Sequence, residues 1–198
     1  MFKMILKQIA KGHRSIVYLT NYKGKKAIKK VERKDISALN RIQNEIFWLK
    51  KLNKFKIGPK IYSFGKNYFI CEYIEGHRII PYLENCKKPI KVIKEILKQC
   101  RTLDKLHIDK KEMSNPYKHI IIIRNKPLMI DFERAKFSLK PSNVTAFFSF
   151  LTSGKILTIL NKKKIEIDID KLKPLLQKYK KSYFDEDFEE LLRIFLFC

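Results

Sequence analysis

The decisive stretch of this sequence is Lys126-Pro127-Leu128-Met129-Ile130-Asp131-Phe132-Glu133-Arg134-Ala135. In it, three consecutive apolar residues, Leu128 to Ile130, lead directly to the carboxylate of Asp131 and then to Phe132. An unbroken apolar run predicts a strand that is buried on both faces. A carboxylate at the end of such a strand either bonds the backbone N–H groups of the next turn or binds a ligand. Residues far upstream decide between these two roles.

The composition indicates a folded and strongly basic protein. The chain has 198 residues, of which 45% are hydrophobic, enough for one domain or two closely apposed lobes. Lys and Arg number 44 against 20 acidic residues, so the formal net charge is +24. Such an excess favours phosphate-rich partners, namely a nucleotide, RNA or another polyanion. The alternative explanation for the excess of lysine is a Lys- and Ile-rich composition inherited from an AT-biased genome. If the surface binds RNA, counterion release predicts an affinity that falls steeply with salt.

The cysteines and the hydropathy pattern indicate a cytoplasmic protein. Cys71, Cys86, Cys100 and Cys198 form no C-x-x-C pair and have no histidine at zinc spacing, so they are predicted to be reduced thiols. No apolar run approaches the ~20 residues that span a bilayer. The first residues are interrupted by lysines and lack the apolar core of a signal peptide. No membrane association is expected.

The first part of the chain is predicted to be rich in strands. Alternating and β-branched runs predict strands at residues 2–9, 15–20, 26–31, 61–64 and 68–74, separated by turns. A helix is predicted from a cap at Asp35 or Ser37 to Leu52, with apolar residues at helical spacing on one face. Glu75-Gly76 ends this part and is the predicted lobe boundary.

The second part is predicted to be mainly helical. Helices are expected at residues 89–107, 144–151, 170–179 and 185–197, and a hairpin with strands at 120–123 and 128–130. The sequence therefore predicts an α+β fold with two lobes, residues 1–75 and 76–198.

Several short motifs accompany this order of elements. The first turn, residues 10–17, keeps the middle glycine and the valine of the pattern G-x-G-x-x-G-x-V. The other motifs are Ala27-Ile28-Lys29 on a strand, Glu45 on the next helix, Cys71-Glu72-Tyr73-Ile74-Glu75-Gly76, and Asp131-Phe132-Glu133. With these motifs the chain resembles the small atypical Ser/Thr protein kinases of archaea, which are distantly similar to RIO kinases. The resemblance covers about residues 5–155 and implies a two-lobed protein-kinase-like fold.

The resemblance also implies roles for individual residues. Lys29 would hold the α- and β-phosphates of ATP and pair with Glu45, and Asp131 would bind Mg²⁺. The expected nucleotide site further includes Gly12, Ser15, Val17, Ala27 and the backbone of Glu72 and Ile74. Two simpler interpretations remain open. Gly12 can be an ordinary turn residue, and Glu45 can be a solvated helix residue that pairs with Arg41.

The catalytic loop departs from the kinase pattern H-R-D-x-x-x-x-N. The usual spacing places His119 at the metal-binding Asn and Ser114 at the catalytic Asp. A loop two residues longer places Glu112 there, and a third register uses His107-Ile108-Asp109. Glu112 is the preferred base, since a serine would serve poorly. His119 is a candidate for metal or phosphate contact, or a core histidine.

The favoured function is ATP-dependent and Mg²⁺-dependent phosphoryl transfer by an atypical Ser/Thr protein kinase. No Ala-Pro-Glu motif follows Glu133, so the acceptor can be a protein or another hydroxyl compound. The alternative is a pseudokinase or scaffold that binds nucleotide without turnover and associates with RNA through its basic surface.

Overall fold

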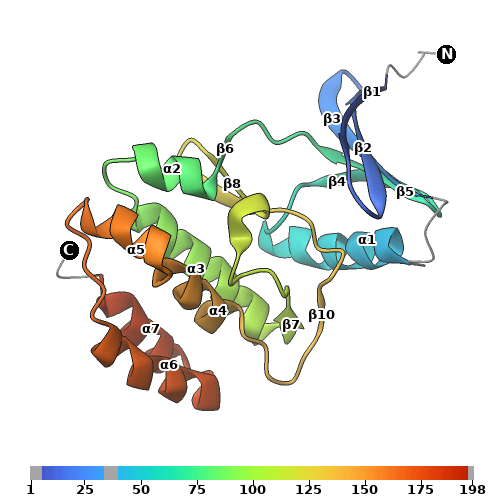
Figure 1. Cartoon of the computed structure of the whole chain (residues 1–198). Helices are drawn as coiled ribbons and strands as arrows, with labels where there is room; N and C mark the ends of the chain where they lie inside the picture. Colours follow the sequence, from blue (N-terminus) through green and yellow to red (C-terminus); the bar gives the residue numbers. More distant parts are fainter. Residues whose placement is uncertain (1–5, 34–39, 196–198) are drawn as a thin grey trace. The chain divides into compact units, whose positions relative to one another are not determined.

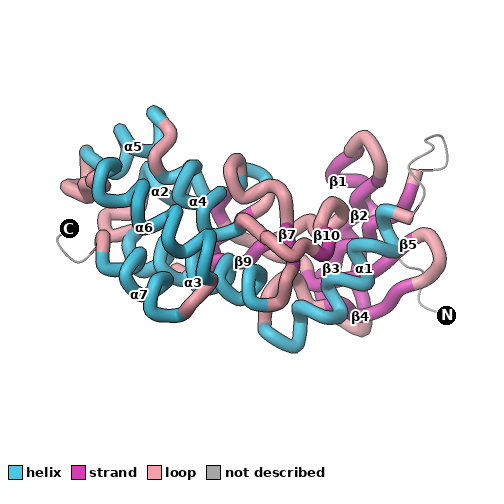
Figure 2. The backbone as a smooth tube through the Cα atoms, turned by 90° about the horizontal axis from the view of Figure 1, so that it is seen from below, coloured by secondary structure: helices cyan, strands magenta, loops and turns pink. Residues whose placement is uncertain are grey.

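The computed structural model describes residues 6–33 and 40–195 and has an α+β fold (Figure 1). The chain divides into two compact units. The first contains the residues up to Glu75 together with Leu128–Ala135, and the second contains Gly76–Pro127 and the residues from Lys136 onward. The segment 128–135, assigned above to the second lobe, is therefore part of the first unit. Strands predominate in the first unit and helices in the second (Figure 2).

The first unit is built on a five-stranded antiparallel sheet in the order β1-β2-β3-β5-β4. Strands β2, β4 and β5 are rich in β-branched and aromatic residues, and three of the connections in the sheet are tight turns. The strands are β1 (Lys7–Lys11), β2 (Ser15–Tyr22), β3 (Lys25–Glu32), β4 (Ile61–Phe64) and β5 (Tyr68–Glu72).

Helix α1 (Arg41–Leu52) packs against this sheet and is followed by the 3₁₀ turn η1 (Asn53–Phe55) (Figure 1). Its buried side chains recur at helical spacing and include Ile42, Ile46 and Leu49. Asn40, immediately before the helix, has a left-handed backbone. The predicted caps Asp35 and Ser37 lie outside the described residues.

Gly58 allows the chain to turn closely past α1 after η1. Its φ is +80°, and a Cβ atom there would lie 2.6 Å from Leu49 Cδ2 and 3.2 Å from Phe132 Cε2. We expect Gly58→Ala to lower the free energy of unfolding by about 2–4 kcal/mol, combining left-handed strain with overpacking. Gly24→Ala is the matched control, because Gly24 has φ +78° but nothing within 4 Å of the added Cβ. Urea denaturation that gave equal losses for both variants would contradict the packing part of this prediction.

The second unit is mainly helical and carries short strand pairs. Its helices are α2 (Ile79–Asn85), α3 (Ile90–Lys105), α4 (Asn143–Leu151), α5 (Gly154–Asn161), α6 (Ile169–Ser182) and α7 (Asp185–Arg193). Its strands are β6 (His77–Arg78), β7 (Ile108–Asp109), β8 (Ile120–Ile123) and β10 (Lys136–Phe137). Strand β9 (Lys126–Met129) begins in this unit and ends in the first. The segment η2 (Pro116–Lys118) is a 3₁₀ turn. The short elements α2, α5, β6, β7 and β10 were not predicted.

The core of the second unit lies between α3 and α4. The buried face of α3 includes Ile93, Leu97 and Cys100, and α4 contributes Phe147 and Phe148, all of them 0% exposed. An amphipathic face of this kind provides most of the stability of a helix in a folded protein.

The described residues also show how long and apolar the helices are, and whether the cysteines are free. Among them, none of the helices is both long and apolar enough to cross a membrane by itself, although α4 and α5, bent by 67° at the break between them, together have the length and apolar composition of a span. Cys71, Cys86 and Cys100 are free thiols, and Cys71 and Cys100 are buried. Burial raises the pKa of both buried thiols above the ordinary value.

Candidate functional site

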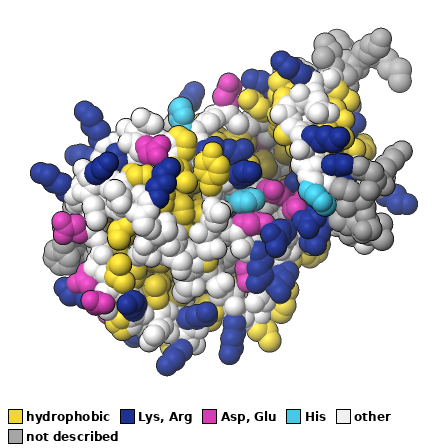
Figure 3. Space-filling model, in the orientation of Figure 1, with side chains coloured by type: hydrophobic (Ala, Val, Ile, Leu, Met, Phe, Trp, Pro, Cys, Tyr) yellow, Lys and Arg dark blue, Asp and Glu magenta, His cyan; other side chains and the backbone are white. Residues whose placement is uncertain are grey.

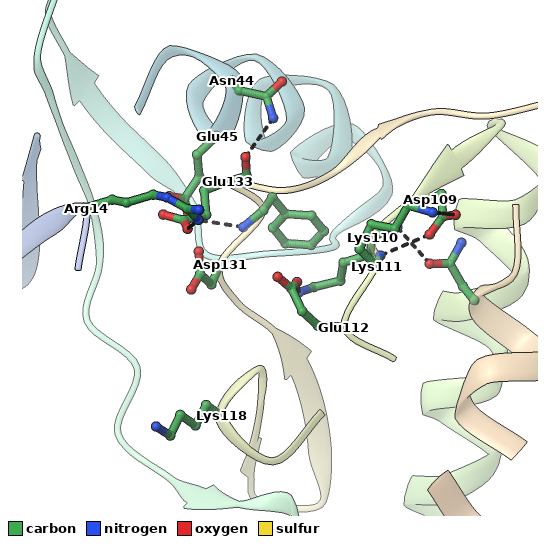
Figure 4. Close-up of polar contacts among 12 residues, drawn as sticks. Arg14, Asn44, Glu45, Asp109, Lys110, Lys111, Glu112, Lys118, Asp131 and Glu133 are labelled. Atoms are coloured by element: carbon green, nitrogen blue, oxygen red, sulfur yellow. Dashed lines mark hydrogen bonds and ion pairs between the residues drawn. The ribbon is translucent and has the colours of Figure 1, made fainter. Parts of the chain in front are cut away.

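The centre of the candidate site is the ammonium group of Lys30 on β3. Lys30 Nζ donates to Glu45 Oε2 at 2.7 Å and to Asp131 Oδ1 at 3.1 Å, and it lies 3.8 Å from Glu133 Oε2. The Lys30 side chain is 12% exposed and that of Glu45 is 3% exposed. Glu45 lies on α1, whereas Asp131 and Glu133 follow β9, and Figure 4 shows the three carboxylates together. The first unit thus encloses one cation among three carboxylates.

The prediction that Lys29 pairs with Glu45 is wrong, because the partner is Lys30. Lys30 lies directly opposite Val17 of β2, and successive residues of a strand point to opposite faces of the sheet. Lys29 is therefore on the other face, where its Nζ lies 4.7 Å from the centroid of the Tyr68 ring.

The same shift of one residue applies to Ala27. Ala27 shares the face of Lys29, whereas Ile28 shares the face of Lys30. The residue two positions before the pairing lysine was expected to be Ala27. Because the pairing lysine is Lys30, that residue is Ile28, which lies on the same face of the sheet as Lys30. Val17 lies on the face of Lys30, as its expected role requires.

The carboxylates fix the charge of Lys30. Burial alone would lower the pKa of Lys30, but the negative charges of Glu45, Asp131 and Glu133 outweigh burial and raise that pKa above its ordinary value. Burial raises the pKa of Glu45, while the positive charge of Lys30 opposes the rise. Lys30 is therefore a permanent positive charge at neutral pH.

The backbone at Asp131 has an uncommon conformation. Its φ is +63°, in the left-handed region, which costs a non-glycine residue roughly 1–2 kcal/mol. The next residue, Phe132, is 0% exposed, and its N–H donates to Glu45 Oε1 at 3.2 Å. Glu45 therefore bonds both the Lys30 ammonium and the backbone that follows Asp131. Strain of this kind is typical of functional positions held by their surroundings.

Helix α1 also holds the chain beyond Asp131. Asn44 Nδ2 donates to the carbonyl oxygens of Glu133 and Ala135, each at 2.9 Å, and Trp48 Nε1 donates to the Ala135 carbonyl at 2.8 Å. One face of α1 thereby supplies donors for these backbone acceptors. These bonds join the end of the segment 128–135 to α1 within the first unit.

The turn between β1 and β2 reaches the same cluster through Arg14. Arg14 Nη1 donates to Glu133 Oε1 at 3.0 Å (Figure 4). Gly12 N–H donates to the carbonyl of Ser15 at 2.9 Å, which closes the turn on itself. Ser15 is 7% exposed.

Three carboxylates of this cluster could hold a metal ion. Glu45, Asp131 and Glu133 each offer an oxygen within 4.8 Å of the others, the one such group found within residues 6–33 and 40–195. Both oxygens of Glu45 already accept hydrogen bonds, from Lys30 and Phe132. Glu133 is engaged in a similar way, by Arg14 and Lys30, so Asp131, whose side chain is 35% exposed, is the better ligand candidate.

The expected adenine-binding stretch follows β5. Glu72 is the last residue of β5, and its N–H donates to the Lys60 carbonyl at 2.9 Å. Because that donor is engaged, an adenine contact from Glu72 would depend on its carbonyl oxygen. Ile74 lies in the loop after the strand and is half-buried.

The expected catalytic loop lies in the second unit, directly after β7. Lys110 is fully buried and its Nζ lies 3.2 Å from Glu112 Oε2, while Lys111 Nζ lies 2.7 Å from Asp109 Oδ2. Two lysines thus precede Glu112 where a kinase has His and Arg. His119 follows the η2 turn and donates its backbone N–H to the Pro116 carbonyl at 2.8 Å.

Asp104 and Asn143 hold this loop in place. Asp104 is 2% exposed and accepts bonds from Asn143 N–H at 3.0 Å, Asn143 Nδ2 at 2.7 Å, Val144 N–H at 3.3 Å and Tyr179 Oη at 2.9 Å. Asn143 Oδ1 in turn accepts from the N–H of Lys110 at 3.0 Å. Burial raises the pKa of Asp104, and these hydrogen bonds oppose the rise.

The basic side chains are distributed widely. Figure 3 shows Lys and Arg over much of the visible face and along its edges, not in one patch. On that face, the basic residues that contribute to the net charge of +24 are therefore dispersed.

No protein-family model matches the chain. It is 30% identical over 114 residues to Uncharacterized protein MJ1211 of Methanocaldococcus jannaschii, and the match covers 57% of this chain and 97% of that protein. The chain belongs to the family of this archaeal protein. The name of that relative states no activity, so membership in its family leaves the function to be inferred from the residues.

Proposed function

We propose that the chain is a two-lobed, protein-kinase-like enzyme of the cytoplasm that transfers the γ-phosphoryl group of ATP to a hydroxyl group. The supporting observation is the enclosure of Lys30 by Glu45 of α1 and Asp131. In protein kinases a strand lysine pairs with a helix glutamate, and an aspartate after a later strand binds the metal ion. An atypical Ser/Thr protein kinase fits this arrangement best.

In phosphoryl transfer the protein mainly positions the reactants and stabilises the charge of the phosphates. The acceptor oxygen forms a bond to the γ-phosphorus as the bond to the β-phosphate oxygen breaks, and the hydroxyl proton passes to a base. Lys30, with its permanent charge, would hold the α- and β-phosphates. Glu112 is the proposed base.

The carboxylate of Asp131 fits Mg²⁺, a hard cation that takes one or two carboxylates beside phosphate oxygens. When bound, it would neutralise charge on the phosphates. An imidazole is a poorer ligand for Mg²⁺, so we give His119 a phosphate contact in preference to a metal bond.

The second candidate is a nucleotide-binding pseudokinase. Two observations favour it: Glu112 is ion-paired with the fully buried Lys110, and lysines stand in place of the histidine and arginine of the kinase loop. Such a protein would bind ATP but not release or transfer the γ-phosphate.

The test is calorimetry of ATP binding with and without Mg²⁺, followed by an assay of γ-phosphate release. We expect Mg²⁺ to strengthen binding to the wild type, and Asp131→Asn to remove that gain, lowering affinity roughly tenfold or more. Asp170→Asn makes the same chemical change at a side chain that is 97% exposed and should have no effect.

The outcomes separate the candidates. Turnover by the wild type that Glu112→Gln abolishes supports the kinase. Binding without turnover supports the pseudokinase, and no ATP binding with or without Mg²⁺ would overturn both.

A further inference from the structure

The turn between β1 and β2 differs from a phosphate-binding glycine turn in its backbone. Such turns bind phosphate through main-chain N–H groups, which approach closely because glycine has no Cβ. Here residues 10–17 contain one glycine, and the N–H of Gly12 is bonded to the Ser15 carbonyl at 2.9 Å. The Gly12 carbonyl accepts from Arg33 Nη1 at 3.2 Å. Both backbone groups of Gly12 are therefore engaged within the protein.

The same turn places a guanidinium group at the candidate site. Arg14 Nη1 donates to Glu133 Oε1, and the other oxygen of Glu133 lies 3.8 Å from Lys30 Nζ. One carboxylate therefore contacts both the turn arginine and the central lysine. The Arg14 side chain is 33% exposed, so it is held in position but still open to solvent.

We propose that Arg14 is a phosphate-binding residue that replaces the missing glycine backbone donors, and that Glu133 positions it. The ligand class is a nucleoside triphosphate, with Arg14 contacting the phosphates beyond the one nearest the sugar. Guanidinium groups bind phosphate through two parallel hydrogen bonds, which lysine cannot reproduce. This inference rests on the proposed function, because it assumes that a nucleotide occupies the cluster around Lys30.

The charges explain why the arginine needs Glu133. Lys30 is already surrounded by Glu45 and Asp131, so a second cation beside it would be repelled unless a carboxylate lay between them. Glu133 has this place, since it contacts both. A bound triphosphate would give Arg14 a second anionic partner, with a higher charge than Glu133. Glu133 would still lie beside Lys30.

The experiment compares the binding of ATP, ADP and AMP, each with Mg²⁺, by calorimetry. We expect Arg14→Ala to weaken ATP binding about 10- to 100-fold, the effect of one charge-assisted contact, and to leave AMP affinity unchanged. Arg14→Lys should recover only part of the loss. Lys29→Ala is the matched control, because it also removes one positive charge from this sheet but lies on the opposite face.

Unchanged AMP affinity in Arg14→Ala shows that the site is still folded. If wild type discriminates ATP from AMP and Arg14→Ala loses this discrimination, the proposal stands. If Arg14→Ala retains the discrimination, or loses ATP and AMP equally, Arg14 has no phosphate role although the proposed function survives. If the wild type binds no nucleotide, the proposed function fails and this inference fails with it.

Discussion

Replacing Lys30 by methionine is expected to reduce ATP affinity roughly 10- to 100-fold, because the proposed nucleotide site would lose the central charge-assisted partner of the phosphates. Lys29→Met is the matched control: the two lysines are adjacent in sequence, but Lys29 lies beside Tyr68 on the opposite face of the sheet. The control should bind ATP as the wild type does. Calorimetry on the two variants side by side measures the difference. Equal affinities for the two variants would overturn the assignment of the central lysine.

The same substitution should also destabilise the first unit. Removing one member of a buried ion pair leaves the other charge uncompensated, which costs about 3–5 kcal/mol. In Lys30→Met the stranded group is Glu45, whose side chain is 3% exposed. The double variant Lys30→Met/Glu45→Gln removes that charge and should recover much of the stability, but not the ATP affinity. Urea denaturation of both variants separates stability from binding.

Asp104→Ala is expected to be the most damaging change in the second unit. It removes the acceptor for two N–H groups at the start of α4, the Asn143 side chain and the Tyr179 hydroxyl. Buried donors that lose their carboxylate acceptor are left unsatisfied, so the free energy of unfolding should fall by about 3–5 kcal/mol.

Asp104→Asn should lose less, because it keeps the shape and one oxygen acceptor. Asp170→Ala provides the comparison at an exposed aspartate and should change stability by under ~0.5 kcal/mol. An Asp104→Ala variant that melts with the wild type would show that the hydrogen bonds to this carboxylate are dispensable.

The longer elements could be predicted from local sequence because their patterns are strong. The runs at residues 61–64 and 120–123 match β4 and β8, and the apolar spacing of α3 and α4 gives helices close to those observed. The short helices could not be found in this way. Helix α2 has seven residues and contains Pro81, and α5 has eight residues and begins at Gly154. In both cases packing in the unit outweighs weak local preference.

In the candidate site, the sequence predicted some residues of the cluster but not the central lysine. Glu45 and Asp131 were expected from motif positions, whereas the choice between Lys29 and Lys30 depends on which face of β3 meets α1. Apolar residues occur on both faces of that strand, Ile28 on one and Ala27 on the other, so alternation does not resolve the choice. Arg14 was missed because its partner Glu133 is 119 residues away in the chain.

The assignment of residues 128–135 to the first unit has a consequence for biosynthesis. Lys30 and Asp131 are 101 residues apart, and chains are synthesised at ~5–20 residues per second. The sheet and α1 therefore leave the ribosome several seconds before the segment that Asn44 and Trp48 will hold. During that interval the helix exposes donors whose acceptors do not yet exist, and Lys30 has Glu45 as its carboxylate partner without Asp131 or Glu133. The nascent first unit matures only after about half of the second has been translated.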